Sequence, residues 1–403
     1  MPTYIKDNLK VILFCSIILL ALWVLIAASR SPVVPNDIPR RQGEPVFSQR
    51  LVAMGDLHGD LENAKTVLQM ASIIDTSSIW IGGTDILVQT GDIIDRGTYA
   101  LDIYRLMRDL RSQASNAGGR VVSILGNHEM MNAIGDWRYV TAGDIDRFEG
   151  VKKRQEVLSV NGWLGREWLA NYSTTALVPL SPYPFSPTLC FTHGSLRPSY
   201  PHLTPYPESI NSLGHSLLLK ALTPPLAPPH PPNPYSGLPK DTTTAEAGVY
   251  DAGGPFWWRG LAEVKDEKTV CNWARELKEK LGVRRVIGGH TPNYEKIVHR
   301  CNASVIIIDT GISSAYGGVL SALEIIYTLT PNQSDTDRSG HRQEPFLPLN
   351  ITNTNDHNQN PNFDSIKSGQ SYLEREEVNA IYPRKKKNII VEERVVVAGP
   401  MRP

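Results

Sequence analysis

The sequence has no surplus of charge of either sign, and it contains few cysteines. Its 41 Lys and Arg residues balance its 41 Asp and Glu residues. Nucleic-acid-binding proteins normally show a basic surplus or a basic stripe, so we expect no nucleic-acid partner. The four cysteines lack the spacing of a metal-binding motif; they are Cys15, Cys190, Cys271 and Cys301.

Three of these cysteines lie beyond the N-terminal region. Cys190 lies in an apolar stretch, which predicts a buried core residue. Cys271 and Cys301 leave two interpretations open. Either they pair in an oxidising lumen, or they remain buried free thiols, which are common in protein cores.

A long apolar run lies near the N-terminus. Residues 11–29 contain no charged side chain, and Lys6 and Lys10 precede them. These nineteen residues, at about 1.5 Å each, come close to the roughly 30 Å hydrocarbon core of a bilayer. The run therefore predicts a single transmembrane signal anchor. A cleaved signal peptide is the alternative, with Ala27 and Ser29 as the small residues before the cut.

The charges around this run favour one orientation. Lys6 and Lys10 lie closer to it than Arg40 and Arg41 do on the other side, which favours a cytosolic N-terminus. We expect a single-pass membrane protein whose main domain is lumenal or extracellular, or a secreted protein if the run is cleaved. Four Asn-x-Ser/Thr sequons fit that placement; they begin at Asn171, Asn302, Asn332 and Asn350.

Residues 50–330 are predicted to form one layered α/β domain. Residues 50–55, 85–91 and 120–126 have the composition of strands, and apolar residues recur at helical spacing between them. Strand and helix in alternation indicate βαβ units. Further strands are expected at 188–193, 284–289, 304–309 and 319–329, with an amphipathic helix at 270–281.

Proline is concentrated in one part of this domain. Sixteen of the 30 prolines fall between Pro179 and Pro239, and such a stretch cannot continue for long as a helix or a central strand. We interpret residues 179–240 as long surface loops with one short helix near 208–222. Loops of this length often serve as lids or binding loops.

The composition changes again towards the end of the chain. Asn, Asp, Gln, Ser and Pro dominate residues 331–403, which predicts a mostly disordered tail. The basic run at 384–387 is interpreted as a solvated charge cluster, with a membrane-surface role as the lesser alternative. Ahead of the domain lie an N-terminal segment (1–10), the anchor (11–29) and a stem (30–49).

Five short polar segments follow predicted strands, and each is flanked by glycine. Ligands collect at the carboxyl ends of strands in open α/β sheets, and glycine allows close backbone approach around a crowded site. Each segment alone is common in turns, but all five together indicate one metal site. The segments are Gly55-Asp56-Leu57-His58-Gly59, Gly91-Asp92-Ile93-Ile94-Asp95-Arg96-Gly97, Gly126-Asn127-His128-Glu129, Thr192-His193-Gly194 and Gly288-Gly289-His290-Thr291.

The residue types in these segments suit a pair of transition-metal ions. Asp56 and His58 are two residues apart after a strand, so both side chains can face one ion. Carboxylate oxygen and imidazole nitrogen suit Zn, Fe or Mn. Asp92 can bridge two ions with its two oxygens, and Asn127 offers a neutral carbonyl oxygen. We therefore expect two divalent metal ions, with manganese, iron and zinc as the candidates.

Together these segments resemble the phosphoprotein phosphatase branch of the calcineurin-like metallophosphoesterase superfamily. Within that branch the chain is similar to the Shewanella-like protein phosphatases, over residues 51–329. The resemblance implies an α/β fold in which two sheets form a sandwich flanked by helices. The closer match is carried by Asn127-His128-Glu129-Met130-Met131-Asn132, Trp257-Trp258-Arg259-Gly260, Gly289-His290-Thr291-Pro292, Asp309-Thr310-Gly311 and Tyr316-Gly317-Gly318.

The resemblance implies two metal sites that share one carboxylate. Two cations roughly 3.5–4 Å apart need a bridging carboxylate to relieve their repulsion. They lower the pKa of the water between them, so that a metal-bridging hydroxide attacks phosphorus. One ion would be held by Asp56, His58 and Asp92, and the other by Asp92, Asn127, His193 and His290.

The resemblance also implies the catalytic residues. His128 would be the general acid that protonates the leaving oxygen, and Asp95 would orient it and raise the pKa of its imidazole. Arg96 and Arg259 would grip the phosphate, because a guanidinium makes bidentate contacts. Arg259 also has a structural interpretation, in which it stacks on the tryptophans before it.

We therefore expect a hydrolase that removes phosphate from monoesters on phosphoproteins. A small-molecule phosphoesterase or polyphosphatase at the same site is an alternative. A non-catalytic binding module is disfavoured, because the ligands and the acid are all present. Ser/Thr specificity does not carry over, since His193-Gly194-Ser195 replaces His-Gly-Gly and residues 309–313 replace Ser-Ala-Pro-Asn-Tyr. Shewanella-like members include enzymes active on phosphotyrosine.

Overall fold

The structure is a computed structural model that describes residues 43–332 and 366–399. From Pro45 onward these residues belong to one compact unit. The predicted signal anchor at 11–29 lies outside the described residues, as do the segment before it and most of the stem. Among the helices that are described, none is long and apolar enough to cross a bilayer.

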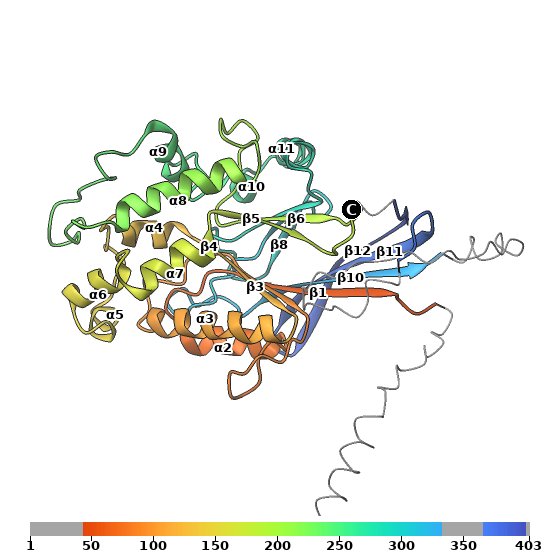
Figure 1. The fold of residues 1–403 in the computed structure, drawn as a ribbon, viewed down its shortest axis with the longest axis horizontal. Helices are drawn as coiled ribbons and strands as arrows, with labels where there is room; N and C mark the ends of the chain where they lie inside the picture. Colours follow the sequence, from red (N-terminus) through yellow and green to blue (C-terminus); the bar gives the residue numbers. More distant parts are fainter. Residues whose placement is uncertain (1–42, 333–365, 400–403) are drawn as a thin grey trace, which may run out of the picture. The chain divides into compact units, whose positions relative to one another are not determined.

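Two mixed β-sheets form the centre of the protein (Figure 1). The seven-stranded sheet has the order β12-β11-β10-β1-β2-β3-β4, and the five-stranded sheet has the order β5-β6-β7-β9-β8. The first sheet contains β1 (Phe47–Met54), β2 (Ile86–Gln89), β3 (Arg120–Ile124), β4 (Tyr172–Ser173), β10 (Ala322–Pro331), β11 (Ser371–Tyr382) and β12 (Lys385–Val397). The second contains β5 (Thr175–Pro179), β6 (Thr188–Thr192), β7 (Arg285–Gly288), β8 (Val298–Arg300) and β9 (Val305–Ile307).

The strands that lead to the polar segments are parallel within each sheet. β1, β2 and β3 run parallel in the first sheet, and β6 and β7 run parallel in the second. Val88 from the first sheet and Phe191 and Ile287 from the second are buried in one apolar cluster, so the two sheets pack against each other. This is the two-sheet sandwich expected from the sequence.

Helices cover the outer sides of the two sheets. α11 shows how the sequence sets their limits: Asp266 accepts a hydrogen bond from the amide of Thr269, and Gly282 ends the helix with a φ of 65°. The helices are α2 (Leu61–Met70), α3 (Ala100–Asn116), α4 (Asn127–Ala133), α5 (Ala142–Arg147), α6 (Val151–Leu158), α7 (Trp163–Asn171), α8 (Glu208–Leu222), α9 (Thr244–Tyr250), α10 (Gly260–Glu263) and α11 (Glu267–Leu281).

The structure decides between the two interpretations of the cysteines that the sequence left open. Cys271 on α11 and Cys301 after β8 form a disulfide bond. Cys190 on β6 is a buried free thiol, and its sulfur lies 2.9 Å from the hydroxyl of Tyr206. α8 occupies the place where a helix was expected within the proline-rich region.

The prediction of a mostly disordered tail is wrong for residues 366–399. β11 and β12 form a hairpin that extends the first sheet, and β11 pairs antiparallel with β10 over ten residue pairs. The sequence does not show the alternation of apolar and polar residues that is typical of such a strand, because Glu374 and Glu376 take inward positions and are almost completely buried. A fragment that ends at residue 330 would lack both strands. Residues 333–365 and 400–403 lie outside the described residues.

A buried ion-pair network explains these inward glutamates. Arg284 binds Glu374 and Glu376 at 2.6 Å each, and Arg285 binds Glu376 at 2.8 Å. Arg285 also pairs with Glu392 on β12. The arginines precede and begin β7 of the second sheet, so the network ties the C-terminal hairpin to the other sheet.

Removing Glu376 should destabilise the fold strongly. Glu376→Ala leaves the guanidinium of Arg285, which is 1% exposed, without its main partner, and breaking such a buried pair costs about 3 kcal/mol or more. Urea unfolding of the full-length protein measures the effect. Glu393→Ala is the matched control, because its pair with Arg375 is 48% and 42% exposed and should contribute no more than about 1 kcal/mol. Equal losses in both variants would contradict this role of the network.

Candidate active site

The polar segments predicted from the sequence meet at one place, where strands of both sheets end. Asp56 and His58 follow β1, Asp92 follows β2, and Asn127 follows β3. His193 and His290 follow β6 and β7 of the second sheet. All of these side chains are at least 96% buried. The carboxyl ends of parallel strands therefore deliver the site, as expected.

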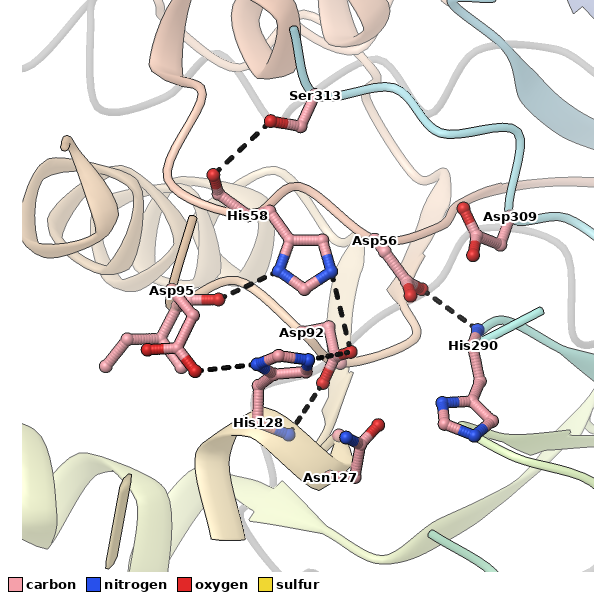
Figure 2. Close-up of polar contacts among 12 residues, drawn as sticks. Asp56, His58, Asp92, Asp95, Asn127, His128, His290, Asp309 and Ser313 are labelled. Atoms are coloured by element: carbon pink, nitrogen blue, oxygen red, sulfur yellow. Dashed lines mark hydrogen bonds and ion pairs between the residues drawn. The ribbon is translucent and has the colours of Figure 1, made fainter. Parts of the chain in front are cut away.

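The carboxylate of Asp92 lies at the centre of this site (Figure 2). Its Oδ2 atom is 3.3 Å from Nε2 of His193, 3.7 Å from Nε2 of His58 and 3.9 Å from Nε2 of His128. Burial alone would raise the pKa of Asp92, but its electrostatic interactions with His193 and His128 hold this pKa well below its usual range. One carboxylate oxygen is thus the common neighbour of three imidazoles.

Backbone carbonyls fix the tautomer of two of these imidazoles. Nδ1 of His58 lies 3.0 Å from the carbonyl oxygen of Ile94, and Nδ1 of His193 lies 2.8 Å from that of Thr90. A carbonyl only accepts hydrogen bonds, so Nδ1 carries the proton and Nε2 presents a lone pair. Both lone pairs face the carboxylate of Asp92, which is itself an acceptor.

Asn127 adds another acceptor to the same place. Its Oδ1 atom is 2.8 Å from Nε2 of His193, while its Nδ2 atom points to the sulfur of Met131 at 3.8 Å. His290 donates from Nε2 to the carbonyl of Trp257 at 3.1 Å, which leaves its Nδ1 as an acceptor. Among the described residues, no donor lies between the acceptors of His193, Asn127 and Asp92. Such converging acceptors fit divalent cations, as neutral imidazole and carboxylate ligands do.

At this site, two groups of buried side chains are compact enough to hold a metal ion. Asp92, His193 and His290 have ligand atoms within 4.8 Å of one another, and so do His58, Asp92 and His128. The first group agrees with the expected ligand set. The second contains His128, the expected general acid, instead of Asp56.

Asp56 lies beside the second group. Its Oδ1 atom accepts a hydrogen bond from the amide of His290 at 3.2 Å. Burial, together with the carboxylates of Asp309 and Asp92, raises the pKa of Asp56 well above its usual range. Such crowding of buried carboxylates is unfavourable unless a cation lies close to them. Asp56 is therefore placed to hold a cation that Asp92 also contacts.

His128 differs from the other histidines in its electrostatics. Its Nδ1 atom is 2.6 Å from the carboxylate of Asp95. Burial alone would lower its pKa, but the carboxylates of Asp92 and Asp95 raise it above the ordinary value. Burial instead lowers the pKa of His58 to about 4 and that of His290 well below the ordinary value. His128 thus favours its protonated form, whereas His58 and His290 favour their neutral forms.

The two predicted phosphate-binding arginines are held in different ways. The guanidinium of Arg96 lies 4.4 Å from the ring centre of Tyr139 and 5.0 Å from that of Tyr316. Arg259 donates from Nη1 to the carbonyl of His290 at 2.5 Å. The alternative in which Arg259 stacks on a tryptophan finds no support among the described contacts, where Arg197 takes that place over the ring of Trp258.

The backbone of the site is strained. His58, Asp92, Asp95, Arg96 and His290 all have positive φ values, between 41° and 73°. Non-glycine residues in this region cost about 1–3 kcal/mol each and persist only where the surroundings hold them in place. Half of the ten predicted site residues therefore have a conformation that local preference disfavours.

Glu129 is one such holding group, and it was not predicted as a site residue. Its Oε2 atom accepts hydrogen bonds from the amides of Asp92 and Gly126, at 2.8 and 2.6 Å. Its Oε1 atom accepts from the amide of Ile93 and the hydroxyl of Tyr104, at 2.9 and 2.7 Å. Its place in the third position of α4, where a glutamate caps backbone amides, is the sequence signal that points to it.

Three further residues of the site were also missed. Tyr139 and Tyr316 enclose Arg96, and the carboxylate of Asp309 lies beside Asp56 (Figure 2). Burial raises the pKa of Asp309 to about 6. Asp309 and Tyr316 belong to segments that carry the family resemblance, whereas no spacing or motif in the sequence marks Tyr139.

Comparison with known proteins agrees with this geometry. Residues 49–294 match the calcineurin-like phosphoesterase family, and the chain belongs to that family. It is a metallophosphoesterase, a hydrolase with His and Asp side chains placed to hold metal ions.

Individual members of the family are also similar to this chain. An uncharacterized protein of Schizosaccharomyces pombe is 34% identical over 76% of this chain and 84% of its own length. Shewanella-like protein phosphatase 2 of Arabidopsis thaliana is 29% identical over 73% of this chain and 79% of its own length. The solved structure of a cold-active protein tyrosine phosphatase shares the fold, with a TM-score of 0.55, 22% identity and coverage of 74% and 84% of the two chains.

Glu129→Gln should weaken metal binding although Glu129 is not a ligand. The amide group of glutamine places a donor where two backbone amides and a hydroxyl already donate, so the loop that carries Asp92 loses its support. Loss of such supporting contacts typically lowers metal affinity about 10- to 100-fold. Competition with a chelating dye measures the affinity. Glu62→Gln on the exposed face of α2 is the control, and an unchanged affinity in Glu129→Gln would contradict this role.

Proposed function

We propose that this protein is a phosphatase that hydrolyses phosphate monoesters on phosphoproteins. The observation that carries the proposal is the convergence of the lone pairs of His58 and His193 on one buried oxygen of Asp92. The residues fit two divalent cations that share this carboxylate. One would be held by Asp56, His58 and Asp92, and the other by Asp92, Asn127, His193 and His290.

The ligands are prepared for this role before any ion arrives. Bound at this position, two divalent cations supply Lewis-acid chemistry, which polarises phosphoryl oxygens and lowers the pKa of water. With pKa values lowered by burial, His58 and His290 are neutral at physiological pH and present their lone pairs without first losing a proton. The carbonyl oxygens of Ile94 and Thr90 keep two of the rings in the required orientation.

His128 has the properties of the general acid. Its partner at Nδ1 is a carboxylate, Asp95, rather than a carbonyl, and this favours the imidazolium. Asn132 donates to the other oxygen of Asp95 at 2.9 Å and so keeps that carboxylate in place. His128 can then deliver the proton on Nε2 to the leaving oxygen of the substrate. The pKa of His128 is raised, whereas those of His58 and His290 are lowered. We therefore assign the role of general acid to His128 and the role of metal ligand to the other two.

Two arginines are available for the phosphate. Arg96 stacks between two tyrosine rings, and its buried Nε atom has no hydrogen-bond partner among the described residues. Stacking holds the guanidinium plane while leaving its N–H groups free for the oxygens of a phosphate. Arg259 is anchored to the backbone of His290, next to one metal ligand. We propose that both bind the phosphate that is transferred to water.

The choice of a protein substrate rests on the relatives. The Arabidopsis relative is named a protein phosphatase, and the structural neighbour is a protein tyrosine phosphatase. The site lacks the segments of the Ser/Thr-specific relatives. We therefore propose a phosphoprotein substrate and leave phosphotyrosine and phosphoserine to the experiment below.

We also propose that this domain works on the lumenal or extracellular side of a membrane. The Cys271–Cys301 disulfide supports this placement, since disulfides persist mainly in oxidising compartments. Two of the four sequons, at Asn171 and Asn302, begin with exposed asparagines, as glycan acceptors require.

His128→Asn should slow hydrolysis most for substrates with poor leaving groups. A general acid typically raises the rate about 10²- to 10⁴-fold. An alkoxide leaving group needs this protonation, whereas nitrophenolate leaves almost as readily without it. We expect a loss in this range for a phosphoserine peptide and roughly 10-fold or less for p-nitrophenyl phosphate. Metal content should stay unchanged, and His215→Asn is the control, because His215 is an exposed residue of α8. Equal losses on both substrates would contradict the role of acid.

A substrate panel tests the proposed function itself. The full-length protein is assayed on a phosphotyrosine peptide, a phosphoserine peptide, polyphosphate and a nucleotide, with metal content measured in parallel. The proposal predicts the highest kcat/KM on a phosphopeptide. A preference for polyphosphate or the nucleotide would instead support a small-molecule phosphoesterase.

A further inference from the structure

A small basic pocket lies between β8 and the β11–β12 hairpin. We call it the hairpin pocket. Its volume is about 250 Å³, and its charged lining residues are Lys296, His299 and Lys387. No acidic residue lines it; the remaining lining is apolar apart from Tyr382. Ligand pockets for drug-sized molecules are roughly 300–1,000 Å³, so this pocket suits a single small anionic group.

The three basic residues of the hairpin pocket have no acidic partner among the described residues. Among the described residues, Lys296, His299 and Lys387 make no ion pair. The neighbouring lysines of the basic run do have partners: Lys386 pairs with Glu324, and Lys385 lies 5.3 Å from the ring centre of Tyr382. Among the three lysines of the run, Lys387 is therefore the one with no described partner.

The three side chains are close enough to influence one another. Partial burial lowers the pKa of His299, and the charges of Lys387 and Lys296 lower it further. Like charges held together without a counter-ion are unfavourable. A bound anion would relieve this repulsion and would raise the pKa of His299 again.

The strand register places the hairpin pocket at the same edge of the sheet as the catalytic site. Ala53, three residues before Asp56, lies opposite Leu323; Leu323 lies opposite Ala380, and Ala380 lies opposite Lys387. Residues that lie opposite each other share a face of the sheet. Three strand spacings of about 4.8 Å separate Lys387 from Ala53 by roughly 14 Å, and Asp56 lies roughly 10 Å further along the strand direction, so Lys387 and Asp56 are roughly 17 Å apart.

An exposed stretch of chain connects the two places. Tyr294, whose side chain is 50% exposed, lies 6.2 Å from the ring of Tyr316 at the catalytic site. Two residues later the chain reaches Lys296 of the hairpin pocket. An extended peptide covers about 3.3–3.6 Å per residue, so roughly 17 Å corresponds to about five residues.

We propose that the hairpin pocket binds a second phosphoryl group of the substrate, about five residues from the phosphate that is hydrolysed. The proposal rests on the phosphatase function proposed above and names its substrate class: protein segments phosphorylated at more than one position. A membrane lipid headgroup is the competing ligand. Lipid surfaces are usually bound by clusters of roughly four to eight basic residues, whereas three line this pocket.

The anion site is tested first without catalysis. Sulfate, which the protein does not hydrolyse, is titrated into the full-length protein while the pKa of His299 is followed by histidine NMR, with the signal assigned from His299→Gln. Sulfate should raise this pKa in the wild type and leave it unchanged in Lys296→Gln/Lys387→Gln. Lys152→Gln/Lys268→Gln is the matched control, since both lysines are exposed and make no described ion pair. An equal response in all three proteins would overturn the site.

The substrate class is tested by kinetics. Peptides with one phosphate are compared with peptides that carry a second phosphate about five residues away on either side, and with a peptide whose second phosphate is adjacent. The wild type should prefer one of the widely spaced peptides in kcat/KM by on the order of 10-fold. Lys296→Gln/Lys387→Gln should lose this preference yet keep its turnover of p-nitrophenyl phosphate. Loss of that turnover would contradict a separate site.

The remaining outcomes separate the hypotheses. If the wild type prefers no doubly phosphorylated peptide while the double variant alone loses binding to phosphatidylserine vesicles, the pocket is a lipid site and the proposal is overturned. If the wild type hydrolyses no phosphopeptide at all, the proposed function fails. The sulfate titration then still decides whether the anion site exists.

Discussion

The crowding of hydrogen-bond acceptors around one oxygen of Asp92 is the constraint on which the site depends. Backbone carbonyls hold His58 and His193 so that their lone pairs face this oxygen, and the amide oxygen of Asn127 joins them. In a buried place such an arrangement is costly unless cations occupy it. The repulsion among these acceptors is therefore unfavourable, and metal binding would relieve it.

The rest of the fold supports this arrangement. Five site residues have left-handed backbone conformations, and the hydrogen bonds of Glu129 to the loop of Asp92 help to hold that loop. The ligands come from both sheets, so the sheets must keep a fixed relation to each other. The apolar cluster between the sheets helps to fix this relation, and so do the ion pairs that join Arg284 and Arg285 to β11.

The sequence predicted the site better than its surroundings, for physical reasons. Asp56 and His290 could be found because ligand-type residues directly follow apolar strands with glycine beside them. The β11–β12 hairpin could not, because Glu374 occupies an inward position whose partners include an arginine 90 residues away in the sequence. Tyr139 was missed because its contact with Arg96 depends on how the chain after α4 folds back, which no local pattern records.

We propose that the carboxylate of Asp92 would hold both of two metal ions. Electron paramagnetic resonance of the manganese-loaded protein, combined with metal analysis, tests this proposal. We expect two manganese ions per chain with magnetically coupled spectra, and loss of the coupling when Asp92 is replaced by asparagine. A single uncoupled ion in the wild-type protein, at saturating manganese, would contradict it.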